Sequence, residues 1–388
     1  MKRFAYFIAI FACALISSCR KSPLDVPVER SVLIYIAGDN DLNSALYRNI
    51  EQLKQGFLPK TGNILVYHDA EDALPRLFRL VKRGSEVVEE LIEQYEEENS
   101  ATPEVLTRCL LRMRELYPAE DYALILSSHA TGWVPQGTRV RFSAPMVFSD
   151  VDYPQVKTFG KDGRYEMELE QLVSAIPYRL SFILFDTCLM GGIEVAYALR
   201  NVTDWMVASP TEIIAEGFPY DQIMQPIFLP RSDLERGLKE VCAAFYRYYS
   251  EHTGGGQWRS ATIALYHTEA LPQLAASVKS IFNTHRDKLN TFVPANHQLQ
   301  RYDQLISGPH LFYDLDHFIS TIATPTEYEG FSQIFEKVVI YKQATPFFMS
   351  IPITRFGGIS TYIPVGQQST LREAYKKTDW NKAVGLLE

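Results

Sequence analysis

The sequence predicts an α/β protein built on a mostly parallel sheet with helices on both faces. Short, unbroken apolar runs alternate with helical stretches over most of the chain. Strands that are apolar throughout are buried on both faces, as in parallel sheets covered by helices. The chain has 388 residues, of which 46% are hydrophobic and 22% charged, so it can bury a large core. One large domain with an extension, or two domains, is therefore expected.

The N-terminal stretch MKRFAYFIAIFACALISSCRK has the features of an export signal. Two basic residues precede an apolar run, Phe4 to Ile16, that is too short to cross a bilayer. Two serines then precede Cys19, as in a bacterial lipobox, where the cysteine becomes the acylated first residue. We predict a lipoprotein signal peptide over 1–18, lipidation at Cys19 and a tether over 19–30. The protein would then be lipid-anchored in the bacterial cell envelope; a plain secretory signal is the alternative.

The remaining elements follow in order along the chain. The first buried strand ends at Gly38, and Gly56 follows the last turn of the next helix. Thr102 and Pro103 open a later helix as its N-cap and first helical residue. Residues 134–165 have no helical or strand period, which indicates a long surface excursion. The expected strands are SVLIYIAG, NILVYHD, PRLFRLVKRG, DYALILSS, SFILFD, DWMVAS and SATIALYH, with a late strand pair formed by KVVIYKQ and GISTYIPV.

The pattern changes to longer helices after about residue 231. We therefore divide the mature chain into a core over 31–231 and a C-terminal module over 232–388 that packs on the core and can add strands to its sheet. The net charge of −8 and the absence of a basic run with interleaved aromatics argue against a nucleic-acid partner.

Three cysteines remain if Cys13 leaves with the signal peptide and Cys19 carries lipid. Cys109 and Cys242 occupy apolar positions of helical stretches and are expected to be small buried hydrophobes. An odd number of thiols cannot pair completely in an oxidising compartment. Cys188 is the cysteine whose position needs a chemical explanation.

Cys188 and His129 each lie just after an apolar strand, in FILFDTCLMGG and YALILSSHATGW. Ligands bind outside the carboxyl ends of the strands in open parallel sheets, and a neighbouring histidine activates a thiol. Cys188 also begins a helical stretch, whose dipole favours an anion. Backbone N–H groups of Ala130 and Cys188 are candidates for an oxyanion hole. A lone Cys or His is more often structural, and His68 and His267, which also end strands, are expected to pack or cap.

Several segments of the chain resemble the clostripain family of cysteine peptidases, which belongs to the caspase-like clan. The segments are LILSSHATGW, FGKDGRYEMELEQLVSAIP, FILFDTCLMGGIEVAYAL and ASPTEIIAEGFPY, with YIAGDNDLN, FYDLDHFI and AYKKTDWNKAVGLL extending the likeness over nearly all of the mature chain. The resemblance implies a caspase-like three-layer α/β/α sandwich. It also implies an endopeptidase that acts through a Cys–His dyad and an acyl-enzyme, without a required cofactor.

The resemblance assigns roles by position. His129 matches the catalytic histidine, Cys188 the nucleophile, and Asp186 a carboxylate of the pocket that selects Arg or Lys before the cut bond. A second acidic pocket residue follows the next strand in the family. Glu212 and Glu216 are both candidates for it, and the sequence does not choose between them.

Two departures from the family pattern bear on specificity. Ala130 follows His129 where the family often has glycine, and Pro210 and Thr211 stand where it usually has acids. Strict Arg or Lys preference is therefore less secure than peptidase chemistry. The alternative is a catalytically weak or inactive surface lipoprotein of the same fold that binds peptide or glycan. A thiol redox protein is disfavoured because the chain has no C-x-x-C pair.

Further expectations concern processing, calcium and partners. Self-cleavage can occur within 134–165, which is rich in Arg and Lys, although a solvated basic loop would have the same composition. Calcium dependence is known in the family, but the sequence has no ligand cluster with EF-hand-like spacing. Protein or peptide substrates, a membrane contacted through the lipid anchor, and a monomeric state complete the expectations.

Overall fold

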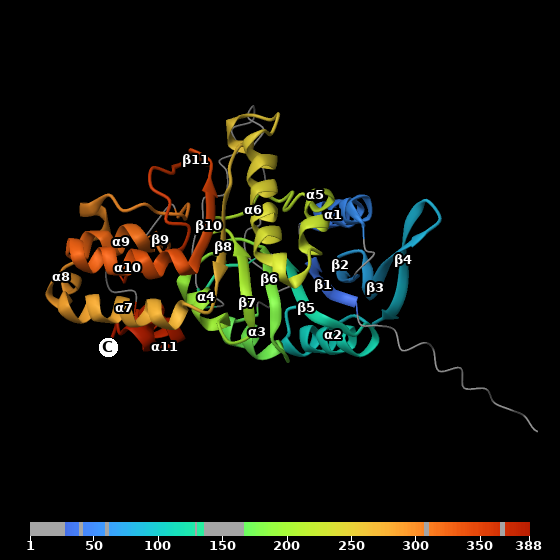
Figure 1. Cartoon of the computed structure of the whole chain (residues 1–388), viewed down its shortest axis with the longest axis horizontal. Helices are drawn as coiled ribbons and strands as arrows, with labels where there is room; N and C mark the ends of the chain where they lie inside the picture. The colour runs from blue at the N-terminus through green and yellow to red at the C-terminus, as the bar shows by residue number, and fades with distance from the viewer. Residues whose placement is uncertain are drawn as a thin grey trace, which may run out of the picture.

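The computed structural model describes residues 28–38, 42–58, 62–128, 130–135, 167–305, 310–364 and 369–388. Its centre is a nine-stranded sheet in the order β10-β8-β7-β6-β5-β1-β2-β3-β4 (Figure 1). The sheet strands are β1 (Val28–Gly38), β2 (Gly62–Ala70), β3 (Ala73–Arg83), β4 (Glu86–Gln94), β5 (Ala119–Ser127), β6 (Leu180–Asp186), β7 (Thr203–Ala208), β8 (Thr262–His267) and β10 (Val339–Ala344). The short strands are β9 (Tyr313–Asp314), β11 (Phe347–Phe348), β12 (Ile351–Pro352) and β13 (Ser360–Thr361).

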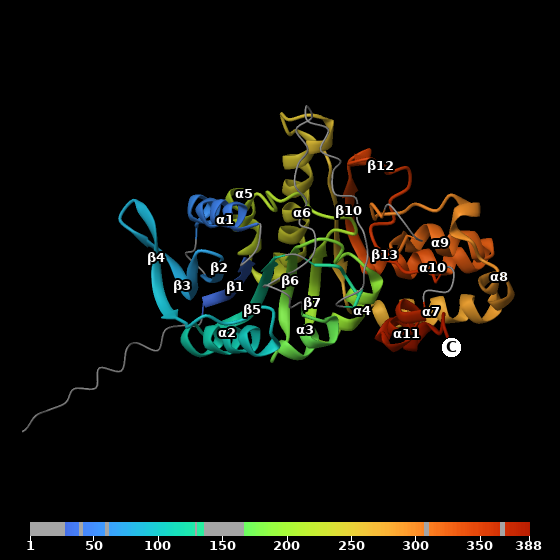
Figure 2. The same cartoon turned by 180° about the vertical axis from the view of Figure 1, so that it is seen from behind.

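Helices form a layer on each face of the sheet. The layer above the sheet in Figure 1 holds α1 (Asn43–Gly56), α5 (Tyr220–Ile227) and α6 (Leu234–Ser250), and the layer below holds α2 (Pro103–Leu116), α3 (Leu169–Ala175) and α4 (Ile193–Leu199). Figure 2 shows the same two layers from behind. The remaining helices are α7 (Leu271–Thr284), α8 (Arg286–Asn290), α9 (Leu315–Ile322), α10 (Pro325–Val338), α11 (Ser369–Lys377) and α12 (Asp379–Val384).

The middle of the sheet is parallel. Strands β7, β6, β5, β1 and β2 run in the same direction, and the strands on either side of them are antiparallel. Every residue of β6 is buried, because helices cover this strand from both faces. The predicted α/β fold with a mostly parallel sheet is confirmed.

Two strands from the C-terminal part of the chain extend this sheet. Strand β8 pairs with β7, and β10 pairs with β8 at the edge. Helices α7 to α10 lie beyond that end of the sheet, on the left of Figure 1. The expected pairing of KVVIYKQ with GISTYIPV is wrong, because β10 completes the central sheet whereas β13 pairs with β9.

The opposite edge of the sheet is a hairpin of β3 and β4. The acidic segment EVVEELIEQ forms β4, and its glutamates pair across the hairpin with arginines of β3. Arg76 Nη1 lies 2.6 Å from Glu89 Oε2, and Arg79 Nη2 lies 2.8 Å from Glu90 Oε2. Charged side chains on an edge strand also discourage pairing with another chain.

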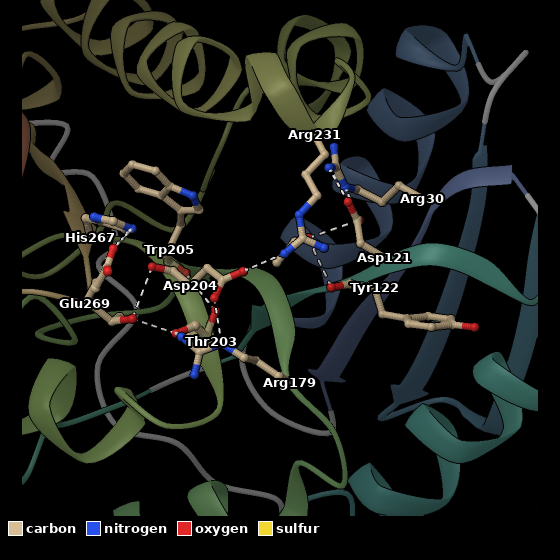
Figure 3. A network of polar contacts seen from close by, with 12 residues as sticks. Arg30, Asp121, Tyr122, Arg179, Thr203, Asp204, Trp205, Arg231, His267 and Glu269 are labelled. Atoms are coloured by element: carbon tan, nitrogen blue, oxygen red, sulfur yellow. Dashed lines mark hydrogen bonds and ion pairs between the residues drawn. The ribbon is translucent and has the colours of Figure 1, made fainter.

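The predicted tether is too long, because β1 begins at Val28 and Arg30 is only 1% exposed. Figure 3 shows the reason: Arg30 meets Asp121 at the start of β5. Arg30 Nε and Nη2 donate to the two carboxylate oxygens at 2.6 and 2.8 Å. The pairing draws Arg30 into the core, so residues 28–30 belong to the sheet.

Some predictions lie outside the described residues. They are the signal peptide over 1–18, the lipid site at Cys19, the catalytic His129, and the excursion from residue 136 to 165. In the part of the chain that the structure describes, no helix is long and apolar enough to cross a membrane.

Candidate active site

Cys188 follows the last residue of β6 by two positions, in the turn that leads to α4. The expectation that Cys188 begins the helix is wrong, because α4 starts only at Ile193. The residue after Cys188, Leu189, has a φ of 60°, a left-handed conformation that is unusual for a bulky side chain. Two backbone bonds hold this turn against the segment after β7. Leu189 N–H donates to Thr211 O at 2.9 Å, and Gly191 N–H donates to Ser209 O at 2.8 Å. The strained turn is therefore fixed from outside, as is common where a reactive group is positioned.

The Cys188 thiol lies against the same segment. The Ile213 N–H donates to Cys188 Sγ at 3.1 Å, and the cysteine is only 1% exposed. An N–H group directed at sulfur favours the thiolate over the thiol. The longer contact from Cys188 Sγ to Ile213 O, at 3.8 Å, is one that only the protonated thiol can donate. The position thus supplies one of the features that a nucleophilic cysteine needs.

Asp186 is the last residue of β6 and is completely buried. Ser127, its register partner at the end of β5, donates to Asp186 Oδ2 at 3.0 Å, and the Tyr220 hydroxyl donates to the same oxygen at 3.0 Å. Gly217 covers the carboxylate closely: a Cβ on this glycine would lie 2.6 Å from Asp186 Oδ2. The carboxylate thus lies between the nucleophile turn and the segment that carries the other acidic candidates.

The loop after β5 approaches the cysteine turn at a glycine. His129 itself is outside the described residues, but Ala130 and Gly132 are within them. Gly132 has a φ of 67°, and a Cβ there would lie 2.7 Å from Leu189 O and 3.1 Å from the ring of Phe312. A residue with a side chain at 132 would therefore push the two loops apart.

The structure separates the two glutamates that the sequence left as alternatives. Glu212 is 2% exposed, and Gln304 Nε2 donates to its Oε2 at 3.0 Å. Burial raises the pKa of Glu212 to about 7. The Glu216 side chain is 31% exposed, and it contacts α6 and the residues after it. Glu212 is therefore an internal group, whereas Glu216 reaches solvent.

The remaining cysteines and the strand-ending histidines have structural surroundings. Cys109 and Cys242 are buried, as predicted, and burial raises the pKa of the Cys109 thiol to about 12. His68 is buried against Tyr47, and burial lowers its pKa to about 4. His267 stacks on Trp205. The packing expected for both histidines is confirmed.

The clostripain family model matches residues 34–384, which is most of the chain. This chain belongs to the clostripain family. The prediction of the family is confirmed, and the caspase-like α/β/α fold with it.

Relatives of known structure support the same assignment. The chain is 33% identical to an inactive zymogen C11 protease from Parabacteroides distasonis, with a TM-score of 0.77 over 92% of this chain and 98% of the other. It is 27% identical to a secreted C11 cysteine protease from Bacteroides thetaiotaomicron, with a TM-score of 0.79 over 92% and 99%. A structure of a secreted C11 cysteine protease from that organism in complex with an irreversible peptide inhibitor matches at 25% identity and a TM-score of 0.76, over 92% and 98%.

Clostripain from Hathewaya histolytica is 26% identical over 223 residues. That alignment covers 51% of this chain and 42% of the relative, so the chain spans less than half the length of this clostripain. The proteins compared are cysteine proteases of the same family, and this chain is by family a clostripain-like cysteine peptidase.

Several neighbours of the candidate site gave no signal in the sequence. Tyr220 and Gln304 bond the acidic candidates, and the Ile213 amide bonds the thiol. A backbone donor has no sequence signature, and Gln304 lies 92 residues from Glu212. No group of three or more His, Cys, Asp or Glu side chains among the described residues could hold a metal ion.

Proposed function

We propose that this chain is an exported, lipid-anchored cysteine endopeptidase that cleaves after Arg or Lys through Cys188 and His129. The observation that carries the proposal is the thiol of Cys188 at the carboxyl end of a central parallel strand, with a backbone N–H donating to its sulfur. Family membership and the inhibitor-bound relative support the reaction class.

In the proposed reaction, the Cys188 thiolate attacks the carbonyl carbon of the scissile bond and forms a thioester. The leaving amine takes a proton from His129, and water then hydrolyses the thioester. Backbone N–H groups of Ala130 and Cys188 would stabilise the oxyanion. The contact between Gly132 and Leu189 supports a short distance between the two loops.

The preference for a basic residue would come from Asp186 and Glu216, of which Glu216 is the exposed carboxylate and Asp186, completely buried behind Gly217, would contribute only its charge. Glu216 is supported over Glu212 by its exposure and by its setting: the Tyr248 hydroxyl donates to Glu216 Oε2 at 3.1 Å, and His252 Nε2 lies 3.6 Å from the same oxygen. One carboxylate oxygen is thus oriented by α6, and Gly217 places the residue next to Asp186. A guanidinium or ammonium group would pair with the exposed Glu216 carboxylate.

The proposal also covers the location of the protein and its processing. A lipid on Cys19 would hold the enzyme, as a monomer, at a membrane in the bacterial envelope, and its partners would be protein or peptide substrates. The zymogen form of one relative supports an activation step in this chain, and we propose self-cleavage within 134–165 as that step. A calcium requirement rests on the family resemblance alone, and no step above uses it.

The test compares wild type, Cys188→Ala and Glu216→Gln on peptides that differ only at the residue before the cut. Wild type should prefer Arg and Lys, Cys188→Ala should lose at least about 10³-fold in kcat/KM, and Glu216→Gln should lose about tenfold on basic peptides only. Equal cleavage by wild type and Cys188→Ala would refute the nucleophile. An unchanged preference in Glu216→Gln would refute the pocket assignment.

The alternative function is a catalytically weak or inactive surface lipoprotein that binds peptide or glycan. The replacements at Ala130 and at Pro210 to Thr211 favour it. Absence of cleavage by wild type, together with saturable binding of the same peptides, would support this alternative.

A further inference from the structure

Glu212 lies directly before the amide that bonds the Cys188 thiol, and a distant residue holds its carboxylate. Gln304 Nε2 donates to Glu212 Oε2 at 3.0 Å. With only 2% of its surface exposed, Glu212 cannot turn toward solvent without disrupting its surroundings. The following residue, Ile213, donates its N–H to Cys188 Sγ at 3.1 Å. The residue that accepts the bond from Gln304 is thus the direct neighbour of the residue that donates to Cys188 Sγ.

Gln304 is itself held by its neighbour Asp303, which is completely buried. The Asp303 carboxylate accepts from the N–H groups of Leu305, Leu311 and Phe312, at 3.2, 2.8 and 2.9 Å. Phe312 in turn lies at the contact between the two catalytic loops. The backbone on either side of Gln304 is therefore anchored, which limits the positions that its partly exposed side-chain amide can take.

We propose that Gln304 and Glu212 are positioning residues for the nucleophile: their hydrogen bond fixes the backbone at 212–213 so that the Ile213 N–H stays directed at Cys188 Sγ. This inference rests on the proposed role of Cys188. The hydrogen bond to sulfur favours the thiolate, so the reactivity of the thiol depends on a side chain from the C-terminal part of the chain.

The chemistry of Glu212 defines which substitutions should be tolerated. Burial raises its pKa to about 7, and the nearby Asp303 adds to this rise while the Gln304 bond opposes it. A protonated carboxyl still accepts from Gln304 through its carbonyl oxygen. Glutamine at 212 can accept the same bond, so Glu212→Gln should preserve the positioning, whereas Gln304→Met removes the donor and leaves a buried acceptor unbonded.

The experiment measures the alkylation rate of Cys188 by iodoacetamide as a function of pH in the full chain, with the modified residue identified by peptide mass spectrometry. Gln304→Met should slow alkylation about tenfold at pH 7 and move its pH midpoint upward. Glu212→Gln should stay within about threefold of wild type. Gln273→Met, at an exposed position of α7, is the control for a generic effect and should match wild type.

An unchanged alkylation profile in Gln304→Met would overturn the proposal. This holds even if the variant unfolds at a lower temperature, because Gln304 would then have a structural role only. If Gln304→Met does not fold, Gln304→Glu decides the question. Its carboxyl can donate only while the pair with Glu212 holds a proton, so its alkylation rate relative to wild type should fall as the pH rises and the pair loses that proton. A constant ratio would overturn the proposal.

Alkylation does not require peptide turnover, so the two proposals fail separately. A wild type that alkylates as expected but cleaves no peptide would refute the proposed function and leave the positioning role supported.

Discussion

The two ends of the central parallel strands are built differently. At the amino end, Arg30 gives two hydrogen bonds to Asp121 (Figure 3). Its Nη1 also donates to Ile227 O at 2.6 Å and to Leu229 O at 3.0 Å. At the carboxyl end, a left-handed leucine follows the cysteine, and buried carboxyl groups have raised pKa values. Charges at the amino end are neutralised by their partners, whereas the carboxyl end keeps strain and groups that titrate near neutral pH. The comparison indicates that stability is concentrated at one end and chemistry at the other.

The largest stability effect is expected at the amino end. Arg30→Met leaves Asp121 buried without its cation, which should lower the free energy of unfolding by about 3–5 kcal/mol. Denaturant unfolding measures this loss, and kcat/KM of the folded fraction should be unchanged. Arg179→Met, which removes a half-exposed arginine from its pair with Asp204, is the control and should cost less than about 1 kcal/mol. Equal losses in the two variants would contradict the distinction between the ends.

Glu194, near the carboxyl end of the parallel strands, should make the free energy of unfolding depend on pH. It is 1% exposed and accepts from Thr361 Oγ1 and the Tyr362 N–H, and burial raises its pKa to about 7. Because the folded state holds the proton more tightly than the unfolded state, Glu194 lowers stability as the pH rises from about 4.5 to about 7, by an amount on the order of 3 kcal/mol. Glu194→Gln, which keeps both accepted bonds, should remove this loss.

The check on Glu194 is urea unfolding of wild type and Glu194→Gln at several pH values. The stability advantage of the variant should grow with pH and level off above about pH 7. An advantage that does not change with pH would show that Glu194 does not titrate in this range.

Gly132 should affect activity more than stability. Alanine there must adopt a positive φ and displace Leu189 O, which would shift the histidine loop relative to the cysteine turn. We expect Gly132→Ala to lower kcat/KM by about 10- to 100-fold, since displacements of about 1 Å have effects of this size. Gly330→Ala, in a helix where a Cβ meets nothing within 4 Å, is the matched control. Full activity in Gly132→Ala would show that the two loops do not need their close contact.

The sequence predicted the carboxyl end of the sheet better than the amino end. The apolar runs of β5 and β6 and the motif around Cys188 are local, so they could be identified without a structure. Arg30 was assigned to the tether because its partner Asp121 lies 91 residues away. The pairing of β10 with β8 is equally non-local. Sequence patterns report local burial, whereas pairing depends on elements distant in the chain.

The same limit applied within the site. Glu212 and Glu216 could not be distinguished, because the difference between them depends on Gln304 in one case and on Tyr248 and His252 in the other. Strand β4 was not identified, because its many acidic residues hide the strand pattern. These glutamates pair with arginines of β3, which only the structure places beside them.

The most direct test of the central claim, that Cys188 is the nucleophile at the carboxyl end of the sheet, is covalent labelling followed by intact-mass measurement. A thiol-directed peptide probe ending in Lys should increase the mass of wild type by that of one probe molecule, attached at Cys188. It should leave the mass of Cys188→Ala unchanged. Equal labelling of both proteins, or labelling of wild type at Cys109 or Cys242 instead, would contradict the account.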